Sequence, residues 1–352
     1  MAILTNEVIK FANGNTDFYE ATLEYVADRK AGKAVGFEKS NLLDKAYFAE
    51  IERKSGVSCE GMELNAWVSH PSVQWASFAI IDASINAILP VVVTPDLGLF
   101  ADLRFAGFGD IIKFRVKPNT LYTVTKGSKG NRTTFRQRKH SADVIISPVE
   151  HYATIYVNLL SVLAGKESIG EFMYNLVLAI ERDMYSEAVD AMVTGIDAAT
   201  SGTNLNESGA FDMKTLLKMC ETVQVKNNGI RPIIAGTATA LLNVIPNSAD
   251  GYRLNVDGNG GSIALIRNVL DYDIVRMTQA LAKNGQLTLP DNKLFIISPA
   301  QDKLIKGAIT SVLTNGNQAF NNADLTEDFT YRKDYDFVYA TAATCAVYEI
   351  TD

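Results

Sequence analysis

The chain is poor in the residues on which disulfide and metal chemistry depend. Its 352 residues include three cysteines and three histidines. The cysteines are odd in number and far apart, with no C-x-x-C pair, which argues against a disulfide framework and favours a reducing cytoplasm. The histidines are scattered, with no H-E-x-x-H or other paired spacing, so we expect no metal site. These residues are Cys59, Cys220, Cys345, His70, His140 and His151.

Signals for membranes, secretion and nucleotides are also missing. No run of eighteen apolar residues occurs, because Asp82, Asn86 and Pro90 interrupt the longest stretches, so we expect no membrane span and no membrane partner. Met1–Lys10 is polar where a signal peptide would be apolar. Neither G-x-G-x-x-G after a strand nor G-x-S-x-G occurs, and Gly165–Lys166 lacks the rest of a phosphate loop. The sequence makes no case for an enzyme, and we expect no catalytic residues and no cofactor.

Residues 111–142 contain no acidic side chain but nine basic ones. The whole chain carries −7, so removing these nine positive charges leaves −16 on the remainder. Clustered like charges repel one another unless opposite charge lies nearby. The nine are Lys113, Arg115, Lys117, Lys126, Lys129, Arg132, Arg136, Arg138 and Lys139.

The same stretch has the pattern of a long β-hairpin. Apolar and basic residues alternate over 111–117, residues 121–125 and 144–146 suit strands, and 127–131 is a turn signal. Such a hairpin is too polar to be stable alone. Three interpretations remain open: a solubilising surface, a nucleic-acid contact with only Tyr122 and Phe135 for base stacking, or docking on an acidic surface of another copy.

Residues 168–195 predict a helix of about seven turns. Ser168 and Glu171 form a capping-box pattern, apolar residues recur at helical spacing, and Gly195 is a plausible C-terminal stop. One face is acidic and could receive the basic hairpin. Its carboxylates include Glu171, Glu181, Asp183 and Glu187.

The rest of the chain indicates an α+β protein. We expect helices at 17–28, 40–54, 71–89 (ended by Pro90), 212–225, 237–244 and 300–309. We expect strands at 91–94, 232–236, 274–277 and 294–298, and paired strands or one bent strand over 337–350. Residues 247–262 form a Gly-, Asn- and Asp-rich loop. Half of a calcium loop at 257–260 lacks its later ligands.

The order of parts resembles the major capsid protein of tailed bacteriophages, with the Hong Kong 97-like fold that encapsulins share. An arm and a basic hairpin precede a helix opening with Gly165-Lys166-Glu167-Ser168-Ile169-Gly170-Glu171-Phe172, and the end reads Tyr339-Ala340-Thr341-Ala342-Ala343-Thr344-Cys345-Ala346-Val347-Tyr348. The resemblance implies an N-terminal arm (1–70), the first part of a P-domain (71–99) and an E-loop hairpin (100–149). A P-domain with a long spine helix (150–204), an A-domain (205–322) and P-domain C-terminal strands (323–352) would follow.

The resemblance implies a structural protein that assembles from hexamers and pentamers into an icosahedral shell around a phage genome. It implies a portal, packaged double-stranded DNA and a separate scaffolding protein as partners, with assembly in the host cytoplasm. Decoration proteins stay open, as does an E-loop crosslink through Lys126 or Lys129. The alternatives are an encapsulin-like compartment, a single-stranded nucleic-acid-binding protein that uses the hairpin, and an enzyme with a dispersed site.

Three placements follow for the assembled state. Residues 1–40 and 111–146 should contact mainly other chains. The hairpin should cross a neighbour's spine helix, with its arginines near the four carboxylates. The third placement puts a loop at the centre of the capsomer: Asp257, Gly258, Asn259, Gly260 and Gly261.

Overall fold

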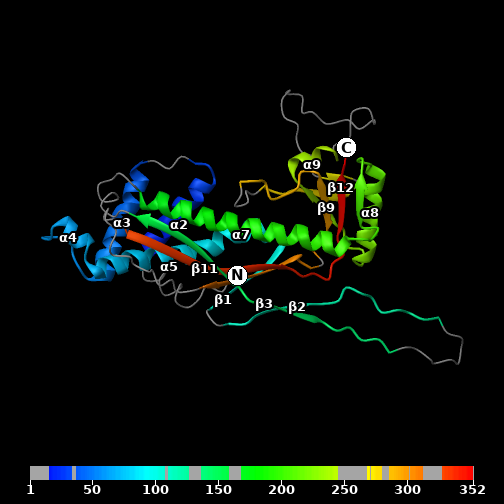
Figure 1. The fold of residues 1–352 in the computed structure, drawn as a ribbon, viewed down its shortest axis with the longest axis horizontal. Coiled ribbons are helices and arrows are strands. Elements are labelled where there is room, and N and C mark those ends of the chain that lie inside the picture. The colour runs from blue at the N-terminus through cyan, green and yellow to red at the C-terminus, as the bar shows by residue number, and fades with distance from the viewer. Residues whose placement is uncertain are drawn as a thin grey trace, which may run out of the picture.

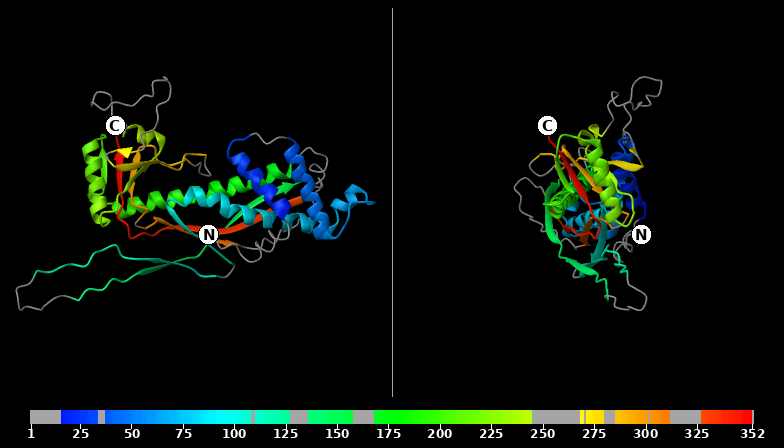
Figure 2. Two further views of the ribbon diagram at one scale, coloured as in Figure 1. Left: turned by 180° about the vertical axis from the view of Figure 1, so that it is seen from behind. Right: turned by 90° about the vertical axis from the view of Figure 1, so that its right-hand side faces the viewer.

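The protein is built on one long helix that joins two sheets. This computed structural model describes residues 16–33, 37–107, 110–126, 136–157, 168–244, 268–269, 271–279, 285–300, 302–311 and 327–351. Helix α7 (Ile169–Thr200) runs along the middle of an elongated molecule, and a hairpin projects away from the body (Figures 1 and 2). At 1.5 Å per residue, α7 is about 48 Å long. The mixed helix and sheet content confirms the predicted α+β class.

Three helices pack around the first half of α7. They are α2 (Thr16–Lys30), α3 (Phe37–Ser55) and α5 (Pro71–Leu97), with the short α4 (Leu64–Val68) beside α5. Side chains from all four long helices form the main core, including Phe18, Tyr47, Ile85 and Met173. Residues 16–30 are therefore anchored within their own subunit. The prediction that residues 1–40 contact mainly other chains is wrong for this segment.

The first sheet lies along α7 and has four strands in the order β1-β10-β11-β4. These are β1 (Ala101–Gly107), β10 (Ile305–Ser311), β11 (Glu327–Tyr339) and β4 (Val149–Val157). β1 and β10 are parallel, and the other two pairs are antiparallel. The helix predicted over 300–309 is wrong: β10 is a central strand whose Ile305 and Ile309 are buried, so pairing on both edges overrides local helical preference.

The second sheet lies at the C-terminal end of α7, in the order β5-β12-β9-β6-β8-β7. Helices α8 (Met213–Lys226) and α9 (Ala238–Leu242) pack against it. The predicted cap is confirmed, because Asp212 accepts hydrogen bonds from the backbone N–H groups of Lys214 and Thr215 at the start of α8. The strands are β5 (Asn206–Gly209), β12 (Ala346–Ile350), β9 (Lys293–Ile297), β6 (Ile233–Gly236), β8 (Tyr272–Arg276) and β7 (Asn268–Val269).

The chain passes between the two sheets twice near its end. β9 leads into β10 of the first sheet, and β11 leads back into β12 of the second. β11 and β12 therefore do not pair with each other, contrary to one reading of 337–350. The implied domain boundaries stay a prediction. β10 lies in the span assigned to the A-domain, and β12 in the span assigned to the P-domain.

Helix α5 is the hydrophobic centre of the molecule. It continues through Pro90 to Leu97, so the predicted stop at Pro90 and the strand at 91–94 are wrong. An internal proline costs about 3 kcal/mol, but Val92, Val93 and Leu97 are buried beyond it, each contributing roughly 1.5–3 kcal/mol. By length and composition residues 71–94 could cross a membrane. However, 72% of the apolar window is buried inside the protein, as expected of a core helix.

The two ends of α7 differ from the sequence prediction. Ser168 is the N-cap residue, but its side chain makes no capping hydrogen bond, so the predicted capping box does not form. Instead, the N–H of Ile169 donates to Asp44 Oδ1 of α3 at 3.0 Å. Helix α7 also continues past Gly195 to Thr200. Gly195 is a contact point rather than a stop, since an added Cβ would lie 2.2 Å from Tyr339 Cγ of β11.

Candidate assembly surfaces

The basic hairpin is anchored at its base by a small apolar cluster. Strands β2 (Ile112–Val116) and β3 (Ala142–Ile146) pair antiparallel, which confirms the ends of the predicted hairpin. Ile112, Phe114 and Ile146 are buried against Ala308 of β10 and fix the base to the first sheet. This small cluster explains the alternation of apolar and basic residues over 111–117.

Beyond its base, most of the described part of the hairpin is exposed, and this part has no backbone ladder. At 121–125 the predicted strand does not form. The side chain of Gln137 instead bridges to Thr123, accepting from its N–H at 2.7 Å and donating to its carbonyl at 2.8 Å. Apolar side chains remain open to solvent, with 71% exposure for Leu121 and 92% for Val124. Both figures show this part extending away from the subunit body.

Part of the hairpin's charge is balanced within the hairpin. Asp143 lies one residue past the basic stretch and opposite Arg115 in the strand register. Its carboxylate is 2.9 Å from Lys113 Nζ and 3.2 Å from Arg115 Nε, and these hydrogen bonds lower the pKa of Asp143. Among the other seven basic residues, Lys117, Lys126, Arg136, Arg138 and Lys139 are exposed, whereas Lys129 and Arg132 lie outside the described residues.

Asparagines connect the hairpin to the crossing between the sheets. Asn119 donates to Asn227 Oδ1 at 2.8 Å, and Asn227 is completely buried. Asn227 in turn donates to Ser298 Oγ at 3.0 Å and to the Thr344 carbonyl at 2.8 Å, one on each crossing segment. The path of the hairpin is thus tied to the point where the chain passes between the sheets.

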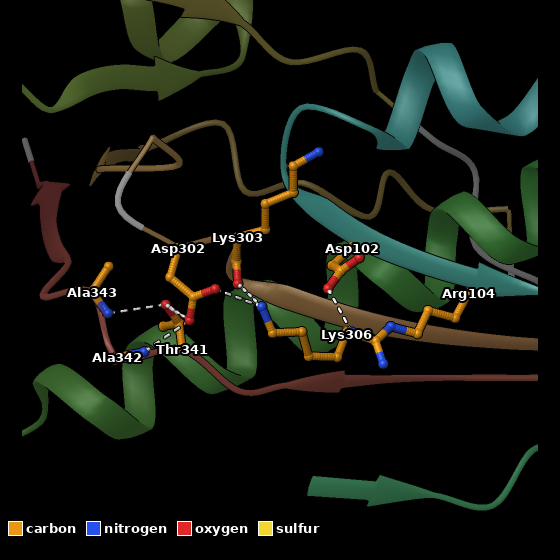
Figure 3. A network of polar contacts seen from close by, with 8 residues as sticks. All are labelled: Asp102, Arg104, Asp302, Lys303, Lys306, Thr341, Ala342 and Ala343. Carbon is orange, nitrogen blue, oxygen red and sulfur yellow. Dashed lines mark hydrogen bonds and ion pairs between the residues drawn. The ribbon is translucent and has the colours of Figure 1, made fainter. Parts of the chain in front are cut away.

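Asp302 holds the same crossing a few residues away (Figure 3). Its carboxylate accepts from Lys306 Nζ at 2.7 Å, from Thr341 Oγ1 at 3.3 Å and from the N–H of Ala342 at 3.2 Å. Lys306 also donates to the Lys303 carbonyl at 2.9 Å. These bonds join the segment before β10 to the segment after β11, so the two sheets are held together by satisfied polar groups.

The predicted spine helix is α7, and each of the four carboxylates predicted on it has a partner in its own chain. Glu181 is buried and contacts Lys30 Nζ at 2.5 Å, so little of its side chain is open to a neighbouring copy. Glu171 is exposed and lies 3.4 Å from Arg29. Tyr335 donates to Asp183 at 2.5 Å, and Glu187 lies 2.8 Å from His151. The capsomer-centre residues Asp257, Gly258, Asn259, Gly260 and Gly261 lie outside the described residues.

A buried lysine between α5 and β11 was missed by sequence reasoning. Lys333 Nζ donates to Asn86 Oδ1 at 2.7 Å, and Asn86 Nδ2 donates to Asp82 Oδ1 at 3.2 Å. Burial lowers the pKa of Lys333 to about 8, although Asp82 and Asp334 oppose the change. Asp82 and Asn86 are the residues that interrupt the apolar run of α5. This interruption was the available signal that the helix holds a polar partner.

Residues 44–337 match the family described as "SPbeta prophage-derived putative capsid protein YonB". The chain belongs to this family. It is a structural major capsid protein with a Hong Kong 97-like fold, as the resemblance implied, and it associates with copies of itself in the virion capsid. This finding does not favour the encapsulin-like compartment or the nucleic-acid-binding alternative. No curated protein matches the capsid protein by sequence.

A solved structure supports the same fold. The capsid protein is similar to a chain in "Capsid of native GTA particle computed with C5 symmetry", with a TM-score of 0.52 and 10% identity, over 74% of this chain and 91% of that one. It is also similar to a chain of the bacteriophage PhiM1 mature capsid, with a TM-score of 0.49 and 12% identity, over 72% of this chain and 86% of that one. Such low identity supports the fold alone.

Lys333 should make stability depend on pH. Below pH 8 it is charged in both states, and between about 8 and its ordinary value of 10.5 only the unfolded chain holds the proton. Unfolding then takes up a proton, so the free energy of unfolding contributed by Lys333 rises with pH across this window, by up to about 3 kcal/mol. Denaturation of unassembled subunits should show this rise relative to Lys333→Met.

The control for this prediction is Lys214→Met, at an exposed position on α8. Its stability difference from the natural protein should not change between pH 8 and 10.5. Parallel pH profiles for the natural protein and Lys333→Met would show that Lys333 does not titrate in this window.

Proposed function

We propose that the hairpin is an assembly arm that lies across a neighbouring subunit in hexamers and pentamers. The observation that carries the proposal is the exposure of its apolar side chains. Leu121, Tyr122 and Val124 are all more than half exposed on a segment that projects from the body. Fully burying such a side chain contributes roughly 1.5–3 kcal/mol, so a neighbour's surface would stabilise the arm.

The charge of the arm favours docking on an acidic surface. Arg136 and Arg138 are exposed, and the part of the chain outside residues 111–142 carries −16 when nine positive charges are removed from −7. Glu171 is the spine carboxylate best placed to meet them, because its side chain is 58% exposed. Single surface pairs contribute roughly 0–1 kcal/mol each, so the charges would set register more than affinity.

Further partners and placements complete the proposal. The shell would enclose packaged double-stranded DNA entering through a portal, and it would assemble in the host cytoplasm with a separate scaffolding protein. The segment 257–261 would lie at the capsomer centre. The subunit would be divided into the N-terminal arm, E-loop, P-domain and A-domain that the resemblance implies.

Charge reversal tests the docking of the arm. Arg136→Glu with Arg138→Glu should reduce shell yield at least tenfold at physiological salt, with the melting temperature of free subunits unchanged. Electron microscopy and sedimentation would measure the yield. In the natural protein, 1 M salt should lower the yield, because screening shortens to about 3 Å.

The matched control reverses two exposed lysines of α8, Lys214→Glu with Lys218→Glu, for the same change in net charge. This variant should assemble normally. Equal yields for the two double variants would contradict electrostatic docking of the arm and leave only its apolar contacts.

A further inference from the structure

Three side chains of metal-ligand type meet between the first sheet and the spine helix. His151 comes from β4, and Asp183 and Glu187 lie one turn apart on α7. One ligand atom from each lies within 4.8 Å of the other two. All three residues are partly buried. The group is separate from the hairpin and from the crossing held by Asp302.

Both ring nitrogens of His151 face oxygen atoms that accept hydrogen bonds, so the protons between them need to be assigned. Its Nδ1 is 3.0 Å from the Val149 carbonyl, which can only accept, so this contact favours the tautomer with a hydrogen on Nδ1. Its Nε2 is 2.8 Å from Glu187 Oε1, which is also an acceptor when ionised. Two acceptors at this distance need a positive centre between them. That centre is either a proton, carried by the imidazole or by the carboxyl group of Glu187, or a metal ion bound to both atoms.

The Val149 carbonyl and the Tyr335 ring orient the His151 imidazole, as neighbouring groups orient the histidine ligands of metal sites. A ligating histidine usually donates its other ring N–H to a carbonyl or carboxylate, which fixes the tautomer and directs the second nitrogen at the metal. The Nδ1 bond to Val149 has this role. The Tyr335 ring stacks on the imidazole at 3.8 Å with 6° between the planes, and its hydroxyl donates to Asp183 at 2.5 Å.

We propose that His151, Asp183 and Glu187 bind one divalent transition-metal ion. Zn²⁺ fits the donor set, because imidazole nitrogen and carboxylate oxygen both bind it at about 2.0–2.2 Å. Mg²⁺ and Ca²⁺ prefer oxygen ligands alone and should bind more weakly. A bound ion would hold each pair of ligand atoms about 3–4 Å apart. The His151 Nε2–Glu187 Oε1 pair, now at 2.8 Å, would open slightly, and no pair of the three ligand atoms is now more than 4.8 Å apart. The ion would fasten edge strand β4 to the spine helix inside each subunit.

The test measures Zn²⁺ binding to the full-length, unassembled chain after treatment with a chelator. We expect one Zn²⁺ per chain by calorimetry and a rise in melting temperature on adding Zn²⁺. Glu187→Gln should weaken binding at least tenfold, and His151→Ala more strongly. Glu187→Gln keeps the fold testable, because its amide can still donate to His151 Nε2.

The control is Glu171→Gln, which makes the same charge change on the same helix at an exposed position. It should bind Zn²⁺ like the natural protein. Co²⁺ should give a visible absorption band that is present with Glu171→Gln and absent with His151→Ala. If Glu187→Gln and Glu171→Gln bind Zn²⁺ equally, the proposal is overturned.

Discussion

A subunit without its hairpin arm should fold but form no shells. The variant replaces residues 117–141 by Asn-Gly, a two-residue turn that joins paired antiparallel strands directly. Val116 and Ala142 are the last residue pair of the β2–β3 ladder, so the join requires no change in register. The buried base of Ile112, Phe114, Ile146 and Ala308 remains. The variant loses the bonds of Asn119, but Asn227 keeps those to Ser298 and Thr344.

Sedimentation and electron microscopy would measure assembly, and circular dichroism with thermal melting would measure folding. We expect shell yield below detection, with a melting temperature within a few degrees of the natural subunit. Asn119→Ala separates the loss of the arm from the loss of its polar anchor, and should lower shell yield much less. Normal shells from the shortened chain would contradict the role of the arm in assembly.

Short-range patterns predicted the elements whose stability is local. The helix cap at Asp212 formed as expected, because its hydrogen bonds lie within three residues. The base of the hairpin formed because its alternation matches one buried face. The turn-side strand at 121–125 did not form. Leu121 and Val124 stay largely exposed to solvent among the described residues, so the pattern of apolar residues alone could not decide whether a strand forms.

Errors arose where distant residues decide the local structure. Asp44, on α3, caps α7 and makes the local capping box unnecessary. Ile305 and Ile309 become part of a central strand only because β1 and β11 lie on either side. Buried side chains beyond Pro90 outweigh the proline in α5. No local window contains these contacts, which explains why propensity failed at each position.

The candidate sites also differ in whether local sequence or distant contacts determine them. The basic charge of the hairpin is a property of sequence, and it was found there. The partner of each carboxylate on the spine helix depends on the fold. The sequence alone therefore could not show that Glu181 is buried whereas Glu171 is exposed. The group of His151, Asp183 and Glu187 joins residues up to 36 positions apart. Only the spacing of Asp183 and Glu187, one helical turn apart, hinted at it.

Gly195→Ala should be among the most destabilising single substitutions in the subunit. The new Cβ would lie 2.2 Å from Tyr339 Cγ and 2.3 Å from Tyr339 Cβ, closer than real atoms approach. Alanine is favoured over glycine within a helix by roughly 0.5–1 kcal/mol, so the local preference opposes the clash. Because α7 and β11 are both held in the main core, we expect a net loss of about 3 kcal/mol or more.

Urea denaturation of unassembled subunits would measure this loss. Gly209→Ala is the matched control, because an added Cβ there meets nothing within 4 Å, and it should change stability by less than about 0.5 kcal/mol. A second substitution tests the cause: Tyr339→Ala removes the ring but keeps its Cβ, which is 2.3 Å from the new methyl group. The double variant should therefore regain only part of the stability that Gly195→Ala loses. Full recovery would show that the ring alone caused the clash, and no loss at all would show that the spine helix and β11 can move apart.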